Sequence, residues 1–237
     1  MIVPSFLNSR RSRAFTLVEL LAVIVIIIVL FSIAVPVVNG LVKTKGLARA
    51  VSDVSEIMDL ARTEAMAKGT YVWLGFKDND RNGKSQLLIV AARSVDGTPK
   101  LRVSGQTNYR FISKVQKVDD ILFTNSARLT SNVKTMLANA GVTPSAVEVS
   151  TISVTPDSMQ IRVESSNVAF TSLITFTPQG EALAVSDPAT ASPPAPFTTQ
   201  MLVGLRKTVN GQDIANDVDS AGIVLYGGTG QIRVFRP

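Results

Sequence analysis

The side chains that most often carry catalysis are absent from this sequence. Its 237 residues contain no histidine and no cysteine. A Ser-His-Asp or Cys-His nucleophile therefore cannot be built, and thiolate metal sites and disulfides are excluded. Acid–base chemistry would fall to carboxylates, lysines or tyrosines. Because the sequence shows no clustering of carboxylates that predicts such a site, we expect a protein that is not an enzyme.

One segment has the residue types and spacing of a cation-binding loop. Asp78, Asp80 and Asn82 place oxygen ligands at alternate positions, and Gly83 would allow the sharp turn of a calcium loop. The position that should supply a bidentate glutamate is Ile89, inside an apparent strand. The alternatives are a calcium site and a polar hairpin turn, and the pattern favours the turn. Apart from this candidate calcium site, no cofactor is expected.

Basic residues are the second candidate for binding chemistry, because the formal net charge is +6. Two groups could contact nucleic acid: Arg206 and Lys207 with Arg233 and Arg236, and Lys114 and Lys117 beside Tyr109 and Phe111. On an ideal strand Arg233 and Arg236 face opposite sides, which weakens the first group. A scattered, solvated basic surface is the favoured interpretation.

A glycine-rich stretch near the C-terminus, Gly227-Gly228-Thr229-Gly230, is the remaining motif with a known chemical use. Phosphate-binding loops of this kind continue into a Lys-Ser or Lys-Thr pair and open a helix. Neither feature follows Gly230, so the stretch predicts a hairpin turn.

The longest apolar run begins at Leu20 and ends at Val38, and Pro36 lies near its far end. About 20 uncharged residues at about 1.5 Å each match the roughly 30 Å hydrocarbon core of a bilayer. Only a helix satisfies its own backbone there, so the run predicts a membrane helix in which Pro36 removes one hydrogen bond. Basic residues flank both ends, so charge does not decide its orientation.

The rest of the chain predicts one long helix followed by a β-rich region. After Gly40, apolar residues recur at helical spacing as far as Lys68, and Gly69 is a natural stop. A shorter helix is expected over 129–140. β-Branched and aromatic stretches between turn residues predict antiparallel strands. We expect them over 71–76, 87–93, 101–103, 109–115, 147–154, 159–163, 168–176, 199–207, 223–226 and 232–235. The predicted fold class is α+β.

The segment Ser12-Arg13-Ala14-Phe15-Thr16-Leu17-Val18-Glu19-Leu20-Leu21 resembles the prepilin processing motif of type IV pilins and type II secretion pseudopilins. In that family a membrane peptidase removes a short basic leader, cutting before a phenylalanine, and methylates the new amine. The resemblance implies cleavage between Ala14 and Phe15, N-methylation of Phe15 and an assembly role for Glu19. The family usually has glycine where this chain has Ala14.

Glu19 also has a local interpretation. Thr16 and Glu19 have the spacing of a capping box at the start of a helix. In the assembly role that the resemblance implies, the Glu19 carboxylate pairs with the Phe15 amine of a neighbouring subunit. The two roles are compatible, and both stay open.

The resemblance also implies a pilin-like fold and its division into regions. These are a leader peptide (1–14), a transmembrane and filament-core helix (15–38), an amphipathic continuation of that helix (39–69) and a β-rich globular head (70–237). The expected fold is therefore a long N-terminal helix packed on an antiparallel β-sheet domain. Two short strings, 174–180 and 222–233, resemble those of the H-type minor pseudopilins.

The function implied is that of a structural subunit of a type IV pilus-like or type II secretion filament. Its expected partners are prepilin peptidase, other pilin or pseudopilin subunits, inner-membrane assembly machinery and the lipid bilayer. The expected location is the inner membrane, crossed once with the N-terminus cytoplasmic and the head periplasmic, and then a filament. The alternatives are a DNA-binding minor pilin for DNA uptake and a membrane-anchored domain that does not polymerise.

Overall fold

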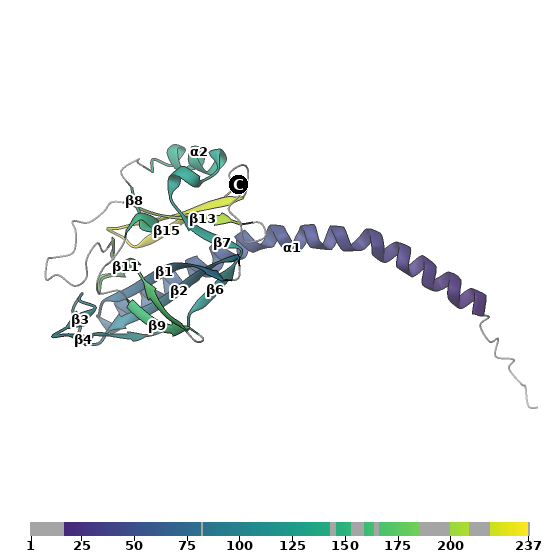
Figure 1. Ribbon diagram of the computed structural model, residues 1–237. Helices are drawn as coiled ribbons and strands as arrows, with labels where there is room; N and C mark the ends of the chain where they lie inside the picture. Colours follow the sequence, from purple (N-terminus) through teal and green to yellow (C-terminus); the bar gives the residue numbers. More distant parts are fainter. Residues whose placement is uncertain are drawn as a thin grey trace, which may run out of the picture. The chain divides into compact units, whose positions relative to one another are not determined.

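The structure is a computed structural model that describes residues 17–81, 83–142, 146–152, 159–163, 166–184, 200–208 and 219–236. At residues 29, 31–45 and 81 the description is limited to the backbone. The chain divides into two compact units, Met1–Thr44 and Lys45–Pro237. Helix α1, Leu17–Lys68, contributes residues to both units (Figure 1).

The second unit is an α+β domain whose strands are mostly antiparallel. Besides its part of α1, it holds α2, Ser131–Asn139, and two short 3-10 helices, η1 Ser126–Arg128 and η2 Val149–Thr151. The described residues form these strands: β1 Val72–Arg81, β2 Lys84–Ser94, β3 Arg102–Val103, β4 Gln106–Thr107, β5 Tyr109–Phe111, β6 Gln116–Asp119, β7 Ile121–Thr124, β8 Val147–Glu148, β9 Met159–Val163, β10 Ser166–Phe170, β11 Ser172–Phe176, β12 Ala182–Ala184, β13 Met201–Lys207, β14 Ser220–Tyr226 and β15 Gln231–Phe235.

Two sheets dominate this unit. The first has the order β12-β11-β1-β2-β5, with β6 also paired to β2. The second has the order β15-β14-β13-β7, with β8 running parallel to β13. The pairs β3–β4 and β9–β10 form separate two-stranded sheets. Long-range pairing therefore connects segments far apart in the sequence, such as β1 with β11 and β7 with β13.

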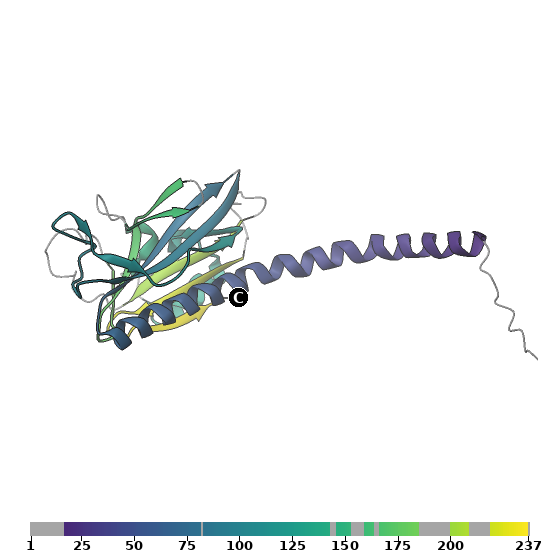
Figure 2. The same cartoon turned by 90° about the horizontal axis from the view of Figure 1, so that it is seen from below.

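The part of α1 that belongs to the second unit packs against both sheets. Its buried residues recur every three or four positions, from Leu47 through Val54 and Met58 to Ala65, which is the spacing of one helix face. They share a single core with residues of the first sheet, such as Leu74, and of the second, such as Val203. Figure 2 shows this part of the helix lying along the strands.

The outer faces of the two sheets are covered by different elements. Trp73 and Leu88 of the first sheet pack with Met159 and Phe170 of the β9–β10 pair. In the second sheet, Leu202, Val224 and Phe235 pack with Leu129, Val133 and Leu137 on and beside α2. The domain is thus layered, with the α1 core in the middle.

Helix α1 ends where the sequence predicts. Gly69 has a φ of 60°, and the Thr70 N–H donates to the Ala65 carbonyl over 3.1 Å. This is the Schellman arrangement, which satisfies a helix-terminal carbonyl and favours glycine. The shorter helix predicted over 129–140 is observed as α2, and Gly141 after it also has a positive φ of 71°.

Several strand predictions need correction. The strand expected over 168–176 is two strands, β10 and β11, which lie in different sheets. The strand expected over 147–154 is the short β8 followed by η2. The sequence did not predict β4, β6, β7 or β12. Pairing with distant strands defines most of these elements, and local composition does not report such pairing.

Candidate functional site

The first unit presents an apolar helical surface. Every large apolar side chain described from Leu17 to Leu30 is between 45% and 79% exposed. These residues are nearly consecutive, so they cover all sides of the helix rather than one stripe. A helix that is apolar all round is normally buried in a large protein or in a membrane. This apolar surface is therefore expected to contact lipid or other protein segments that lie outside the described residues.

Glu19 is the acidic residue in the first turn of α1, and it is exposed. A carboxylate at this position is favoured by the helix dipole by about 0.3–1 kcal/mol. The following Leu20 is 58% exposed. Ala14, Phe15 and the proposed capping partner Thr16 lie outside the described residues, so cleavage, methylation and the assembly role of Glu19 stay predictions.

In the described part of the chain, no helix is both long enough and apolar enough to cross a membrane. The span predicted from Leu20 to Val38 includes Pro36 and other residues whose side chains are not described. The membrane span and the topology therefore stay predictions.

The candidate calcium loop forms a β-hairpin in the structure. Asp78 and Asp80 lie in β1, opposite Leu87 and Ser85 of β2, and Gly83 in the turn has a φ of 73°. This confirms the hairpin interpretation. Asn82 lies outside the described residues. Among those that are described, no group of three or more acidic side chains is placed to hold a metal ion, and calcium binding stays a prediction.

Asp78 makes a contact that the sequence did not predict. Its Oδ1 accepts a hydrogen bond from the Phe123 N–H over 2.9 Å, which joins β1 of the first sheet to β7 of the second. Close packing around the carboxylate raises the pKa of Asp78 from 3.8 to about 6 by desolvation, although the hydrogen bond from Phe123 and the charge of Lys77 oppose this shift. The residue as a whole remains exposed.

Asp96 forms a second carboxylate cluster that the sequence analysis missed. Its Oδ1 accepts hydrogen bonds from the Thr98 N–H at 2.9 Å, the Thr98 hydroxyl at 2.8 Å and the Ser94 hydroxyl at 3.0 Å, and also from Asn108 Nδ2. The hydrogen bond from the Thr98 backbone contributes most to lowering the pKa of Asp96 to about 2. The Asp-Gly-Thr sequence is a signal for such a turn. These hydrogen bonds, all accepted by one carboxylate oxygen, fix the loop after β2.

The basic residues do not assemble as the nucleic-acid interpretation requires. Arg206 is buried, and its Nη1 donates to the Arg128 carbonyl over 2.8 Å. Tyr109 and Phe111 are partly buried against the β9–β10 side of the first sheet, and the Tyr109 hydroxyl accepts from the Gln160 N–H over 2.9 Å. Lys114 and Lys117 are exposed. The aromatic rings beside them are therefore occupied in packing rather than presented for base stacking.

Gly227-Gly228-Thr229-Gly230 is the turn between β14 and β15, and the Gly230 N–H donates to the Tyr226 carbonyl over 2.7 Å. The hairpin prediction for this stretch is confirmed.

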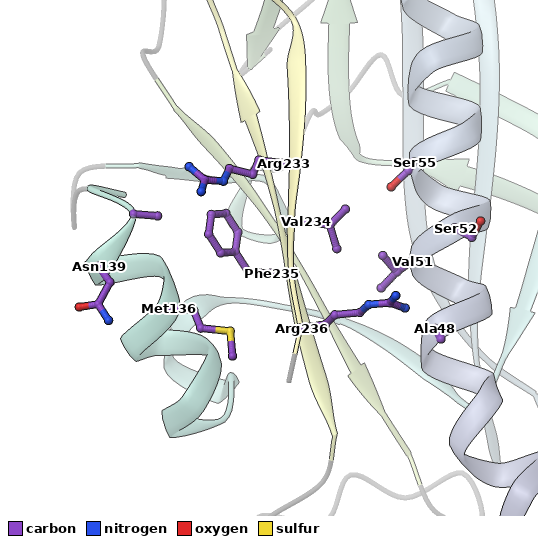
Figure 3. Close-up of a pocket in the computed structure, with 11 residues that line it drawn as sticks. Ala48, Val51, Ser52, Ser55, Met136, Asn139, Arg233, Val234, Phe235 and Arg236 are labelled. Carbon is purple, nitrogen blue, oxygen red and sulfur yellow. The ribbon is translucent and has the colours of Figure 1, made fainter.

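Strand β15, which follows this turn, borders an open groove of about 880 Å³ between α1 and α2 (Figure 3). Arg233 and Arg236 both line it. Strand alternation predicts that these two arginines face opposite sides, which argued against a shared site for them.

Comparison with protein families identifies a single segment. The model of the prokaryotic N-terminal methylation motif matches residues 9–35, which include Ala14, Phe15 and Glu19. This match supports the type IV pilin and pseudopilin family. The motif implies a pilin-like protein that prepilin peptidase processes and that assembles with other pilin subunits. It is typical of membrane-anchored pilins processed at the inner membrane, whose subunits are structural and not enzymatic. No curated protein and no solved structure matches the chain significantly.

Proposed function

We propose that this chain is a minor pilin-like subunit of a type IV pilus-like or type II secretion filament. One observation carries the proposal: the methylation motif at residues 9–35 overlaps the part of helix α1, from Leu17 to Leu30, in which every large apolar side chain described is 45% exposed or more. Burial of apolar surface is worth about 25 cal/mol per Å². A helix of this kind is therefore stabilised by lipid before assembly and by neighbouring helices in a filament.

Processing at Phe15 prepares the subunit for this transfer. Cleavage after Ala14 removes the basic leader and leaves a methylated, cationic amine at Phe15. In the filament this amine pairs with Glu19 of a neighbouring subunit, because a carboxylate drawn into apolar surroundings costs several kcal/mol without a partner. Glu19 thus selects the register between adjacent helices.

The subunit is held in the inner membrane by residues 15–38 before assembly, with the leader in the cytoplasm and the head in the periplasm. The α+β head, in which the second half of α1 packs on antiparallel sheets, is consistent with a pilin-like fold. Assignment to the H-type minor pseudopilins rests on the strings 174–180 and 222–233. These form strand β11 with the following turn and the β14–β15 hairpin.

The test is to express the chain with a prepilin peptidase and its filament machinery, and to measure the mass of the mature N-terminus. We expect an N-methylated Phe15 in the wild type. Glu19→Ala should be cleaved but lost from filaments, whereas Glu19→Asp, which keeps the charge, should retain part of the incorporation. Leu21→Ala serves as a control for a local change in the same apolar segment.

Two results would contradict the proposal. A chain that keeps Met1 in the presence of active peptidase is an anchored domain and not a processed subunit. Filament incorporation of Glu19→Ala at the wild-type level would remove the proposed role of the carboxylate.

A further inference from the structure

Strand β15 is an open edge of the second sheet. It pairs with β14 on one side, from Gln231 opposite Tyr226 to Phe235 opposite Gly222, and no other strand of the described chain pairs with it. In an antiparallel sheet, alternate residues of an edge strand point their N–H and C=O groups away from the partner. Such an edge is a template for pairing with another chain.

The groove of about 880 Å³ runs along this edge. Small side chains of α1, those of Ala48, Ser52 and Ser55, line one wall, and Met136 and Asn139 of α2 line the other (Figure 3). The small residues on α1 leave the space beside β15 open. All lining residues belong to the second unit.

The groove carries positive charge that no acidic lining residue balances. Arg233 and Arg236 line it, and no lining residue is acidic. Within the described ranges neither arginine forms an ion pair, although the Arg233 guanidinium lies 5.3 Å from the Phe235 ring centroid. Arg233 lies in β15 and Arg236 directly follows it, and their side chains point to opposite sides of the chain, yet both reach the groove because it borders the edge of the strand (Figure 3). Arginine forks bind carboxylates in two parallel hydrogen bonds.

A hydroxyl at the α1 wall also lacks a partner. The Ser55 Oγ is buried and makes no hydrogen bond among the described residues, although a helical serine commonly bonds the carbonyl four residues earlier. Ser55 lines the groove. An orphaned buried hydroxyl costs free energy, and rotation of the Ser55 side chain toward a polar group in the groove would relieve that cost.

We propose that this groove binds an extended, acidic segment of a partner protein, which adds as a further strand to β15 and places carboxylates on Arg233 and Arg236. Main-chain hydrogen bonds to the open edge supply the strand pairing. The carboxylates, spaced three residues apart on opposite faces of the incoming strand, match the spacing of the two arginines.

The same features favour a peptide over nucleic acid. Val234 and Met136 are each 37% exposed at the groove, which suits the side chains of a strand. Phe235 is buried, so it offers no free face for base stacking. Two arginines are few for a phosphate backbone, whose affinity grows with the number of neutralised phosphates.

The experiment measures binding of defined peptides to the full-length chain in detergent by fluorescence anisotropy. The probe is a short peptide of threonine and valine with two glutamates three residues apart. Its controls are a version with lysines in place of the glutamates and a version with alternate backbone nitrogens methylated. Both controls should bind at least about tenfold more weakly, since one loses the charge match and the other the strand pairing.

Variants of the chain locate the site. Arg233→Gln combined with Arg236→Gln should weaken binding on the order of tenfold, whereas Arg162→Gln, an exposed arginine on β9, should leave it unchanged. Ser52→Phe should block the groove. Thr63→Phe is the matched control, because Thr63 is also exposed on α1 but does not line the groove.

Equal binding of the glutamate and lysine peptides, or of the methylated and unmethylated peptides, would overturn the proposal. Tighter binding of an oligothymidylate than of the glutamate peptide, lost in the double arginine variant, would assign the groove to nucleic acid instead. Neither readout depends on cleavage at Phe15, so failure here is distinct from failure of the proposed function.

Discussion

At the scale of single residues, Asp78 joins the two sheets through its side chain. The sequence makes it a candidate calcium ligand in a segment that favours a hairpin turn, and in the structure its Oδ1 accepts a hydrogen bond from the Phe123 N–H of the other sheet. The rings of Phe76 and Phe123 stack beside this link with centroids 5.1 Å apart. The hydrogen bond and the ring contact together tie β1 to β7.

Asp78→Asn should change how stability depends on pH. The folded pKa of Asp78, about 6, lies above its unfolded value of 3.8, so the folded state binds the proton more tightly. The stabilising effect of protonation is complete below about pH 4 and is lost as the pH rises through about 6. The asparagine can still accept from Phe123 but does not ionise. Relative to wild type, the variant should therefore gain stability between pH 4 and pH 7.

The measurement is denaturant unfolding of the full-length chain in detergent across that range. Asp80→Asn, an exposed residue on the same strand, is the control. If the difference in unfolding free energy between Asp78→Asn and wild type stayed constant from pH 4 to 7, desolvation of Asp78 would not contribute to stability.

At the scale of elements, β13 is the centre of the second sheet, and glycine lets its neighbours approach. Gly204 lies opposite Thr124 of β7 and Gly222 of β14. A Cβ built on Gly204 would lie 2.4 Å from the Thr124 carbonyl oxygen, a backbone atom that cannot turn aside. A Cβ on Gly222 would lie 3.4 Å from its nearest neighbour, the Leu202 Cδ1 atom.

Gly204→Ala and Gly222→Ala form a matched pair for testing this packing. Gly204→Ala should destabilise the chain by about 1–3 kcal/mol, because β7 must shift away from β13. Gly222→Ala should be neutral or stabilise by a few tenths to about 1 kcal/mol, since alanine restricts the unfolded chain. Thermal unfolding compares the two. Equal changes in stability for the two variants would show that the contact between Gly204 and the Thr124 carbonyl is not as close as the structure shows.

At the scale of the whole molecule, the two units differ in whether their apolar side chains are exposed or buried. The described side chains of the first unit expose apolar groups, whereas the core of the second begins at Leu47. Helix α1 thus has an N-terminal part whose apolar side chains are exposed and a C-terminal part whose apolar side chains are buried in the core of the second unit. This division matches a subunit whose head is complete before assembly.

A chain that begins at Lys45 tests this division. It keeps every residue of the shared core, so we expect a folded monomer without detergent, seen by size-exclusion chromatography and circular dichroism. A chain that begins at Leu60 should fail to fold. It lacks Leu47, Val51, Val54, Ile57 and Met58, each worth about 1.5–3 kcal/mol of burial against a total stability of about 5–15 kcal/mol. Aggregation of the Lys45 chain alone would show that the head depends on the first unit.

The features that the sequence determined by itself are local ones. The methylation motif and Glu19 lie within one short segment, and the family comparison finds them there. The stop of α1 at Gly69 and the turn at Gly83 follow from conformations that glycine adopts most easily. The apolar run after Glu19 shows in composition alone.

Only the tertiary structure decided the contacts between segments distant in the chain. Asp78 and Phe123 are 45 residues apart, and residues 166–176 divide between two sheets because each strand pairs with a different partner. The alternation of a strand correctly assigns Arg233 and Arg236 to opposite faces, but it does not reveal that their strand lies at an open edge. That depends on which strands occupy the neighbouring positions, and such pairing is set by packing across the whole domain, which local sequence does not encode.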